Sequence, residues 1–249
     1  MEQIFILGNG AMASAMAYGL RDKYDVTLVG RNVQKLKNLK EDGFKTEIYG
    51  EKFDINDKKI ILAFKPYALK SVAEKLIGKS NFLISVLATS SIDDIKECIN
   101  SNIYIKAMPN IAAKFKSSIT PFCSQNDNIN DAMDILSTFG EVCRVDNENE
   151  LNIAMAISGC APAYLAVVAE AMACGVVSVG LKKDMAHKLT AGVFKSISSL
   201  LEDSHPAFIK ESVCSPAGTT IAGVDVLEEC AVRSAFIKAI KASVDKTNK

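Results

Sequence analysis

The segment IFILGNGAMASAM, residues 4–16, decides the fold of the first half of this 249-residue chain. Four apolar residues lead directly into the pattern Gly8-x-Gly10-x-x-Ala13, which opens a helix-forming segment. Gly8 permits a tight turn, Gly10 lets the backbone approach a pyrophosphate, and the small Ala13 allows a helix to pack closely on a strand. N–H groups at the helix start would face the phosphates. We therefore expect a dinucleotide here, against the alternative of a plain strand, turn and helix. The predicted cofactor contacts in this loop are Gly8, Gly10, Ala11, Met12 and Ala13.

Short β-rich runs alternate with amphipathic segments through the first half of the chain, as in repeated βαβ units around a parallel sheet. The apolar run Ile60–Leu62 suits a strand in a sheet that is covered on both faces. The pattern therefore predicts an α/β fold whose N-terminal part is a Rossmann-type doubly wound sheet. The predicted strands are 3–8, 25–30, 59–64, 82–87, 102–108 and one near 141–146, and the predicted helices include 11–22, 32–41, 67–77 and 127–139.

After about residue 150 the strand pattern stops and the remaining sequence favours helices. Residues 151–181 carry a single charge, Glu170, so a membrane span is one alternative. Gly159 and Pro162 interrupt the run and the rest of the chain has a soluble composition, so we expect no membrane contact. A helix that is apolar all round needs cover on every side, and we predict that a second copy of the chain supplies it. We place a dinucleotide-binding domain at 1–150 and an all-α dimerisation domain at 151–249, divided at a polar stretch.

The composition excludes several classes of protein. Lys and Arg total 29 and Asp and Glu total 29, so the chain has no excess of positive charge that would indicate a nucleic-acid partner. The N-terminus has no basic segment followed by a long apolar run, and we expect neither a signal peptide nor an anchor. Seven scattered cysteines without a C-x-x-C pair suit reduced thiols in the cytoplasm, and two isolated histidines make a metal site or a Ser/His/Asp triad improbable.

The end of the second predicted strand bears on the choice of cofactor. An NAD site usually has an acidic residue there for the ribose 2′-hydroxyl, whereas this chain reads VTLVGRN and ends the strand with Gly30 and Arg31. A guanidinium suits a 2′-phosphate, which a carboxylate would repel. We therefore expect NADP, in its reduced form NADPH. If Arg31 is only a solvated turn residue, NAD stays open as the cofactor.

Two further loops follow predicted strands at their carboxyl ends, where doubly wound folds bind ligands. They are AFKP, residues 63–66, and KAMPN, residues 106–110. Prolines would stiffen both loops, and Asn110 offers a donor and an acceptor. We expect the loops to frame the nicotinamide. The predicted contacts are Ala63, Lys65, Pro66, Met108, Pro109 and Asn110.

Read together, these motifs resemble the pyrroline-5-carboxylate reductases over the whole chain. The family's glycine loop, A-V-K-P loop and M-P-N loop match the stretches already described. Its S-G-S-G-P-A-Y appears as SGCAPAY, residues 158–164, and its H-P as His205–Pro206. Its T-S-P-G-G-T-T-I-A-G appears as CSPAGTTIAG, residues 214–223, which is the most specific match because no generic fold demands it.

The chain departs from the family pattern at a few positions. Ile111–Ala112 replace Thr-Pro, Thr89 replaces a frequent Gly, Cys160–Ala161 replace Ser-Gly, and Cys214 replaces Thr. These exchanges conserve volume well enough for the pockets to survive. Ala217 is the exception, since the family's glycine could be required there for a positive φ or for close approach of a substrate carboxylate.

The resemblance implies hydride transfer from NAD(P)H to the cyclic imine 1-pyrroline-5-carboxylate, giving L-proline. It places the substrate on SPAGTT, residues 215–220, where N–H groups at a helix start would bind the carboxylate. Thr220 is the candidate catalytic residue, with its hydroxyl on the ring nitrogen. Ser215 would bind substrate or cap the helix; the two threonines could also merely start that helix. The predicted substrate contacts are Ser215, Ala217, Gly218, Thr219 and Thr220.

The resemblance also implies an active site in the cleft between the two domains and a homodimer, or a higher homo-oligomer, formed by the C-terminal helices. Three alternatives stay open. One is a reductase of another cyclic imine, and one is a reductase of a small hydroxy or keto acid. Hydroxy-acid enzymes of similar plan carry a catalytic lysine on the long helix, and residues 163–177 contain none. The third is a dinucleotide-sensing protein that has lost turnover.

Overall fold

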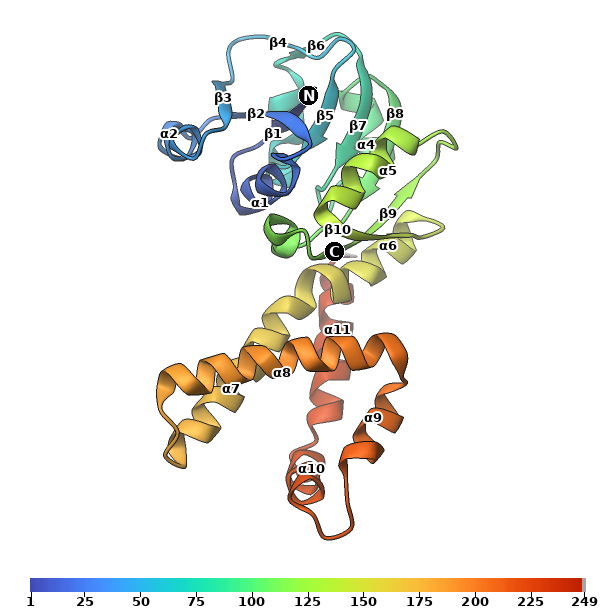
Figure 1. Cartoon of the computed structure of the whole chain (residues 1–249). Coiled ribbons are helices and arrows are strands. Elements are labelled where there is room, and N and C mark those ends of the chain that lie inside the picture. The colour runs from blue at the N-terminus through green and yellow to red at the C-terminus, as the bar shows by residue number, and fades with distance from the viewer. Residues whose placement is uncertain (248–249) are drawn as a thin grey trace. The chain divides into compact units, whose positions relative to one another are not determined.

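The computed structural model describes residues 1–247, which form two compact units (Figure 1). Unit 1 consists of Met1–Gly159 with Thr247, and unit 2 of Cys160–Lys246. Unit 1 contains a sheet with helices on its faces, and unit 2 contains helices (Figure 1). This is the predicted α/β unit followed by a helical one, so the predicted fold class is confirmed.

The main sheet of unit 1 has eight strands in the order β10-β9-β8-β7-β5-β1-β2-β3. From β3 to β8 neighbouring strands are parallel, β9 is antiparallel to β8, and β10 is parallel to β9. The chain leaves β1 toward one edge and returns to continue on its other side. A ligand crevice is therefore expected at the carboxyl ends of β1 and β5. The strands are β1 Glu2–Leu7, β2 Tyr24–Gly30, β3 Lys45–Ile48, β5 Lys59–Leu62, β7 Ser80–Ser85, β8 Ser101–Ala107, β9 Ser118–Ser124 and β10 Gly140–Arg144.

Both faces of the sheet are buried, and β1 shows how. Ile4 and Ile6 belong to the apolar cluster on one face, while Phe5 and Leu7 belong to the cluster on the other. Alternate side chains of a strand point to opposite faces, so an entirely apolar strand requires cover on both. The helices of unit 1 are α1 Ala11–Leu20, α2 Val33–Glu41, α3 Leu69–Ala73, α4 Ile92–Cys98, α5 Asn130–Leu136 and α6 Glu148–Met155, with 3₁₀ turns at Pro66–Ala68, Ile111–Phe115 and Ser137–Phe139.

Three parts of unit 1 differ from the sequence prediction. Strand β3 was not predicted because three of its four side chains are exposed at the edge of the sheet. Strand β9 was missed because Pro121 lies inside it, and proline argues against a strand in the sequence. The helix predicted at 67–77 ends at Ala73, and the next residues pair as β6, Leu76–Ile77, with β4, Phe53–Asp54.

Unit 2 consists of five helices with few buried side chains. The structure buries four of its side chains, Ala173, Ala186, Thr190 and Ile209. Large apolar residues on the same helices are exposed, among them Val167 at 66% and Leu189 at 57%. A single copy of unit 2 therefore lacks a core of ordinary size. The helices are α7 Ala161–Ser178, α8 Lys183–Asp203, α9 Pro206–Val213, α10 Thr219–Glu229 and α11 Val232–Thr247.

The apolar run predicted at 151–181 is one helical segment with an irregular turn. Helix α6 passes through the π-helical turn Ala156–Cys160 into α7, with Pro162 in the first turn of α7. Leu151 of α6 is fully buried with Met108 and Cys123, so α6 packs against β8 and β9 as part of unit 1, which extends to Gly159, whereas the boundary predicted from the sequence is at 150.

The same segment, Glu148–Ser178, is long and apolar enough to cross a membrane by length and composition, and an 18-residue window within it has a mean hydropathy of 1.8 and is 6% buried within the chain. Helices that a partner subunit covers meet the same criteria.

Candidate active site

Gly8 lies at the turn between β1 and α1, where only a glycine fits. Its φ is +143°, and a Cβ at this position would lie 2.2 Å from the carbonyl oxygen of Ala63. The Gly8 N–H donates to the carbonyl of Val29 at 2.7 Å. The glycine therefore joins the ends of β1, β2 and β5 at one point, which is a packing demand beyond the tight turn predicted from the sequence.

Gly10 is bounded by open space instead. It is the N-cap of α1 with an extended backbone, and a Cβ placed on it would meet no atom within 4 Å. No side chain caps the helix and its first turn has no acidic residue, so no side chain accepts from the N–H groups at the helix start, Ala11, Met12 and Ala13. Ala13 is fully buried against the sheet. This arrangement fits a pyrophosphate, because free N–H groups and the helix dipole both favour an anion.

Arg31 follows β2 directly and its side chain is exposed. Among residues 1–247 no carboxylate forms an ion pair with it. The register pairs Gly30 with Ile48, so Arg31 and Tyr49 continue the two strands on the same face of the sheet. Burial raises the pKa of Tyr49, the Arg31 charge opposes this rise, and the Tyr49 hydroxyl is buried without a hydrogen-bond partner. The positive charge of Arg31 is therefore free to meet an anionic ligand.

The AFKP and MPN loops reach the same carboxyl edge of the sheet. Ala63 continues β5, and its N–H donates to the carbonyl oxygen of Leu7 at 2.9 Å. Pro66 starts a 3₁₀ turn. Met108 and Pro109 are buried, whereas Lys65 is exposed. The structure thus brings the predicted residues of β1, β2, β5 and β8 together at one edge.

Asn110 is more constrained than the sequence indicated. Its Nδ2 donates to the carbonyl of Ser158 at 2.8 Å, and its Oδ1 accepts from the Ala112 N–H at 2.9 Å. The Ser158 hydroxyl in turn donates to the Met108 carbonyl at 3.2 Å. These reciprocal bonds hold the MPN loop to the π-helical turn, so the Asn110 side chain acts first as a brace of the loop.

Lys106 precedes the MPN loop and is 2% exposed. Its Nζ lies 2.9 Å from the Glu148 Oε2, and the same carboxylate accepts from the Ile92 N–H at the start of α4. Sequence reasoning assigned no role to this pair. A lysine directly after the apolar run IYI was the available signal, since a buried charge requires a partner.

The SPAGTT stretch in unit 2 forms the turn between α9 and α10. Gly218 is the N-cap of α10, no side chain caps the helix, and its first turn has no acidic residue. The helix cap proposed for Ser215 is absent. The Ser215 carbonyl accepts from the Gly218 N–H at 3.0 Å, and a Cβ on residue 218 would lie 2.3 Å from the Ser215 Oγ. The N–H groups at Thr219 and Thr220 are therefore available to an anion.

Ala217 lies in this turn with φ +57°, the left-handed region. An L-residue other than glycine is strained there by about 1 kcal/mol. The alanine therefore adopts the conformation for which the family pattern has glycine, and the turn forms despite the methyl group.

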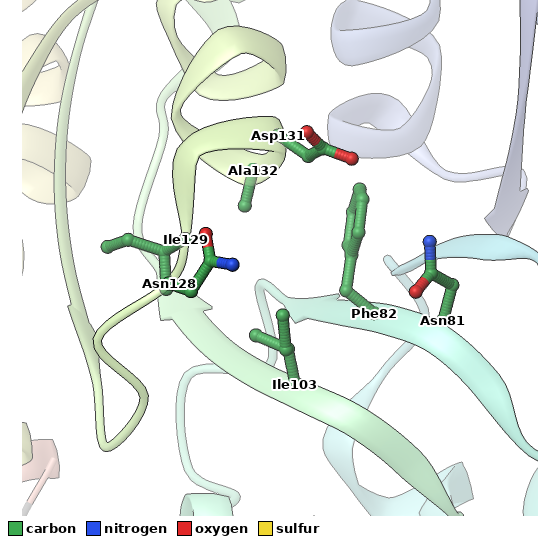
Figure 2. A pocket seen from close by; sticks show the side chains of 7 residues that line it. All are labelled: Asn81, Phe82, Ile103, Asn128, Ile129, Asp131 and Ala132. Atoms are coloured by element: carbon green, nitrogen blue, oxygen red, sulfur yellow. The ribbon is translucent and has the colours of Figure 1, made fainter.

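A separate pocket of about 170 Å³ lies near the amino ends of β7 and β8, whereas the glycine loop follows the carboxyl end of β1. Figure 2 shows the side chains that line this pocket. Its Asp131 carboxylate is already paired with Lys59 at 3.0 Å. None of the predicted site residues lines it. The lining residues are Asn81, Phe82, Ile103, Asn128, Ile129, Asp131 and Ala132.

Comparison with known proteins identifies the family. A pyrroline-5-carboxylate reductase of Helicobacter pylori is 36% identical over 99% of both chains. This chain belongs to the pyrroline-5-carboxylate reductase family. The Synechocystis member is 38% identical over 74% of this chain and 72% of its own. Residues 148–249 match the family model "Pyrroline-5-carboxylate reductase dimerisation", and residues 3–89 match "NADP oxidoreductase coenzyme F420-dependent".

Solved structures of the pyrroline-5-carboxylate reductase family share the fold. The Streptococcus pyogenes enzyme superposes with a TM-score of 0.88 at 26% identity, covering 98% of this chain and 97% of that one. The Coxiella burnetii enzyme gives a TM-score of 0.80 at 26% identity, covering 98% and 97%. The predicted family and fold class are confirmed over the whole chain.

Proposed function

We propose that this protein reduces 1-pyrroline-5-carboxylate to L-proline with NADPH. The observation that carries the proposal is the uncapped N-terminus of α10 at Gly218–Thr220, whose free N–H groups would suit a carboxylate beside the Thr220 hydroxyl. Family membership indicates the substrate class, and the free N–H groups at the start of α10 suit the carboxylate of that substrate. The proposed place of action is the cytoplasm, which suits a chain whose seven cysteines are all free.

Unit 1 would hold the cofactor, which when bound supplies the hydride for the C=N carbon. The cradle at Gly10 and the first turn of α1 would bind the pyrophosphate, and Arg31 would favour NADPH over NADH by binding the 2′-phosphate. The AFKP and MPN loops would position the nicotinamide. The residues assigned to the cofactor are Gly8, Gly10, Ala11, Met12, Ala13, Arg31, Ala63, Lys65, Pro66, Met108, Pro109 and Asn110.

Unit 2 would hold the imine. The N–H groups of Thr219 and Thr220 would bind its carboxylate, and Ala217 and Gly218 shape the turn that exposes them. The Thr220 hydroxyl would hydrogen-bond the ring nitrogen and hold it in one orientation. A threonine is a weak acid, so orientation is its main contribution. Ser215 would close the turn at the substrate.

We further propose that unit 2 is completed by a second copy of the chain, in a homodimer or a larger homo-oligomer. Its helices expose a row of apolar residues on α8, including Leu189, Val193 and Ile197. These residues are spaced four apart and form one stripe of the helix. Such a surface favours a partner with the same apolar character.

The test of the reaction is Thr220→Ala assayed by NADPH oxidation with pyrroline-5-carboxylate. We expect kcat to fall about 10- to 100-fold, the worth of a hydrogen bond to a charged group, while the NADPH dissociation constant changes less than about twofold. Thr220→Ser should restore most of kcat, and Thr219→Ala is the adjacent control. Equal losses in turnover and NADPH binding would remove Thr220 from the substrate site.

A substrate panel separates this function from the alternatives. Wild-type protein is assayed with pyrroline-5-carboxylate, other cyclic imines and small keto acids at equal concentration. The proposal expects the highest kcat/KM with pyrroline-5-carboxylate. A preference for another imine or a keto acid would replace it, and binding of NADPH without any turnover would leave a sensing role.

A further inference from the structure

Asn9 links two loops of unit 1 that are far apart in the sequence. It lies between the two glycines of the β1–α1 turn and is half-buried. Its Nδ2 donates to the carbonyl oxygen of Asn32 at 2.8 Å. The bond joins the cradle assigned to the pyrophosphate to the turn that carries Arg31.

Gly30 makes room for this link. A Cβ on Gly30 would lie 2.6 Å from the Asn9 Cγ and 2.8 Å from its Nδ2. The Gly30 backbone is not in the left-handed region, so the glycine is required for space and not for conformation. Asn9 therefore packs over the last residue of β2 as well as bonding to the turn beyond it.

Both neighbours of Arg31 are fixed in this way. Gly30 lies beneath Asn9 and its carbonyl accepts from the Tyr49 N–H at 3.2 Å. Asn32 is held by Asn9 at its carbonyl, and its Oδ1 accepts from the Lys35 N–H at 3.0 Å, capping α2. These contacts hold the backbone on both sides of Arg31, while the Arg31 side chain is exposed and has no ion-pair partner among residues 1–247.

We propose that Asn9 is a positioning residue for Arg31 and thereby sets the preference for a 2′-phosphate over a 2′-hydroxyl. A guanidinium gains most from a phosphate when its approach is fixed in advance, because less conformational freedom is lost on binding. Removing the link should weaken ligands that use Arg31 and leave the others nearly unchanged. The inference rests on the role of Arg31 in the proposed function and does not depend on the imine.

The test measures binding of 2′,5′-ADP and of ADP by calorimetry, without turnover. For Asn9→Ala we expect affinity for 2′,5′-ADP to fall about tenfold and affinity for ADP to change less than about twofold. Asn9→Leu keeps the packing volume over Gly30 and removes the N–H donor, so it should behave similarly and decides the matter if the alanine variant does not fold. Asn38→Ala, on the exposed face of α2, is the matched control and should change neither ligand.

Three results would overturn the inference, two with the Asn9 variants and one with Arg31→Ala. Equal weakening of both ligands would make Asn9 a general support of the glycine loop, and unchanged binding of both would make the link irrelevant. Arg31→Ala serves as the reference, since it should abolish the preference for 2′,5′-ADP. If it does not, Arg31 is not the 2′-phosphate contact and the inference fails, while the imine reduction is judged separately by the Thr220 variants.

Discussion

The two units of this chain bury their apolar residues in opposite ways. In unit 1, Ile6, Leu28 and Ile61 are inaccessible to solvent at the centre of the sheet, and helices cover both faces. In unit 2, Val167 on α7 and Leu189 on α8 are more than half exposed. Unit 1 completes its own core, whereas unit 2 would supply part of a shared core in the proposed dimer. The stability of unit 2 should therefore depend on protein concentration, and that of unit 1 should not.

The largest effect is expected from a charge on the apolar stripe of α8. Leu189→Glu would bury an unpaired carboxylate in the proposed interface, at a cost of several kcal/mol, and should raise the dimer dissociation constant more than about 100-fold. Light scattering during gel filtration over a concentration series measures it. Lys195→Glu on the same helix is the control. An unchanged oligomer with Leu189→Glu would mean that α8 is not in the interface.

The ion pair between the buried Lys106 and the half-buried Glu148 should come next. Lys106→Met removes the positive charge beside the Glu148 carboxylate, which keeps the Ile92 N–H as a donor, and should lower the free energy of unfolding by about 2 kcal/mol. Urea unfolding followed by circular dichroism checks this. Lys45→Met removes an exposed pair with Asp25 and should cost less than about 1 kcal/mol. Similar losses in both variants would show that the burial of Lys106 has no energetic weight.

The reactivity of buried and exposed cysteine thiols tests the effect of burial chemically. Burial raises the pKa of the Cys123 thiol to about 11, whereas Cys143, Cys174 and Cys230 are exposed. Cys123 should thus react about 100-fold more slowly with a thiol reagent at pH 8 than a thiol of ordinary pKa, because its raised pKa lowers the thiolate fraction by about that factor. Peptide mapping after timed labelling measures the rates. Because the folded protein holds the proton more tightly, this thiol's contribution to stability is present below pH 9 and lost between pH 9 and about 11.

The smallest effect is expected at Ala217 in unit 2. Ala217→Gly should raise the free energy of unfolding by about 0.5 to 1 kcal/mol, because glycine adopts a φ of +57° without strain. Ala222→Gly, inside α10, should have the opposite sign and cost about 1 kcal/mol. Thermal unfolding at one fixed protein concentration compares them. Destabilisation by both substitutions would show that the turn at residue 217 carries no strain.

How well the sequence predicts this protein depends on whether the signal is local. Strands β1, β5 and β7 were predicted because each contains an unbroken run of three or four apolar residues, and the glycine motif identified the residues that follow β1. Strand β9 was missed since its pairing with β8 overrides Pro121, which no local pattern reveals.

The site follows the same division between local and distant contacts. The loops were found by motif, but the bond from Asn110 to Ser158 spans 48 residues and the link from Asn9 to Asn32 spans 23. Such pairs depend on how the strands are ordered in the sheet. Spacing along the chain therefore identified the loops and could not show which side chains hold them together.

Gly8 and Gly10 differ in a way that has a genetic consequence. A methyl group on Gly8 would collide with the Ala63 carbonyl, so a Gly8→Ala chain should not fold and a cell carrying it beside the normal gene should show little effect. A methyl group on Gly10 meets only the open cradle, so a Gly10→Ala chain should fold and enter mixed oligomers without binding the cofactor. The first substitution is expected to be recessive and the second dominant, although only Asn9 separates the two glycines in the sequence.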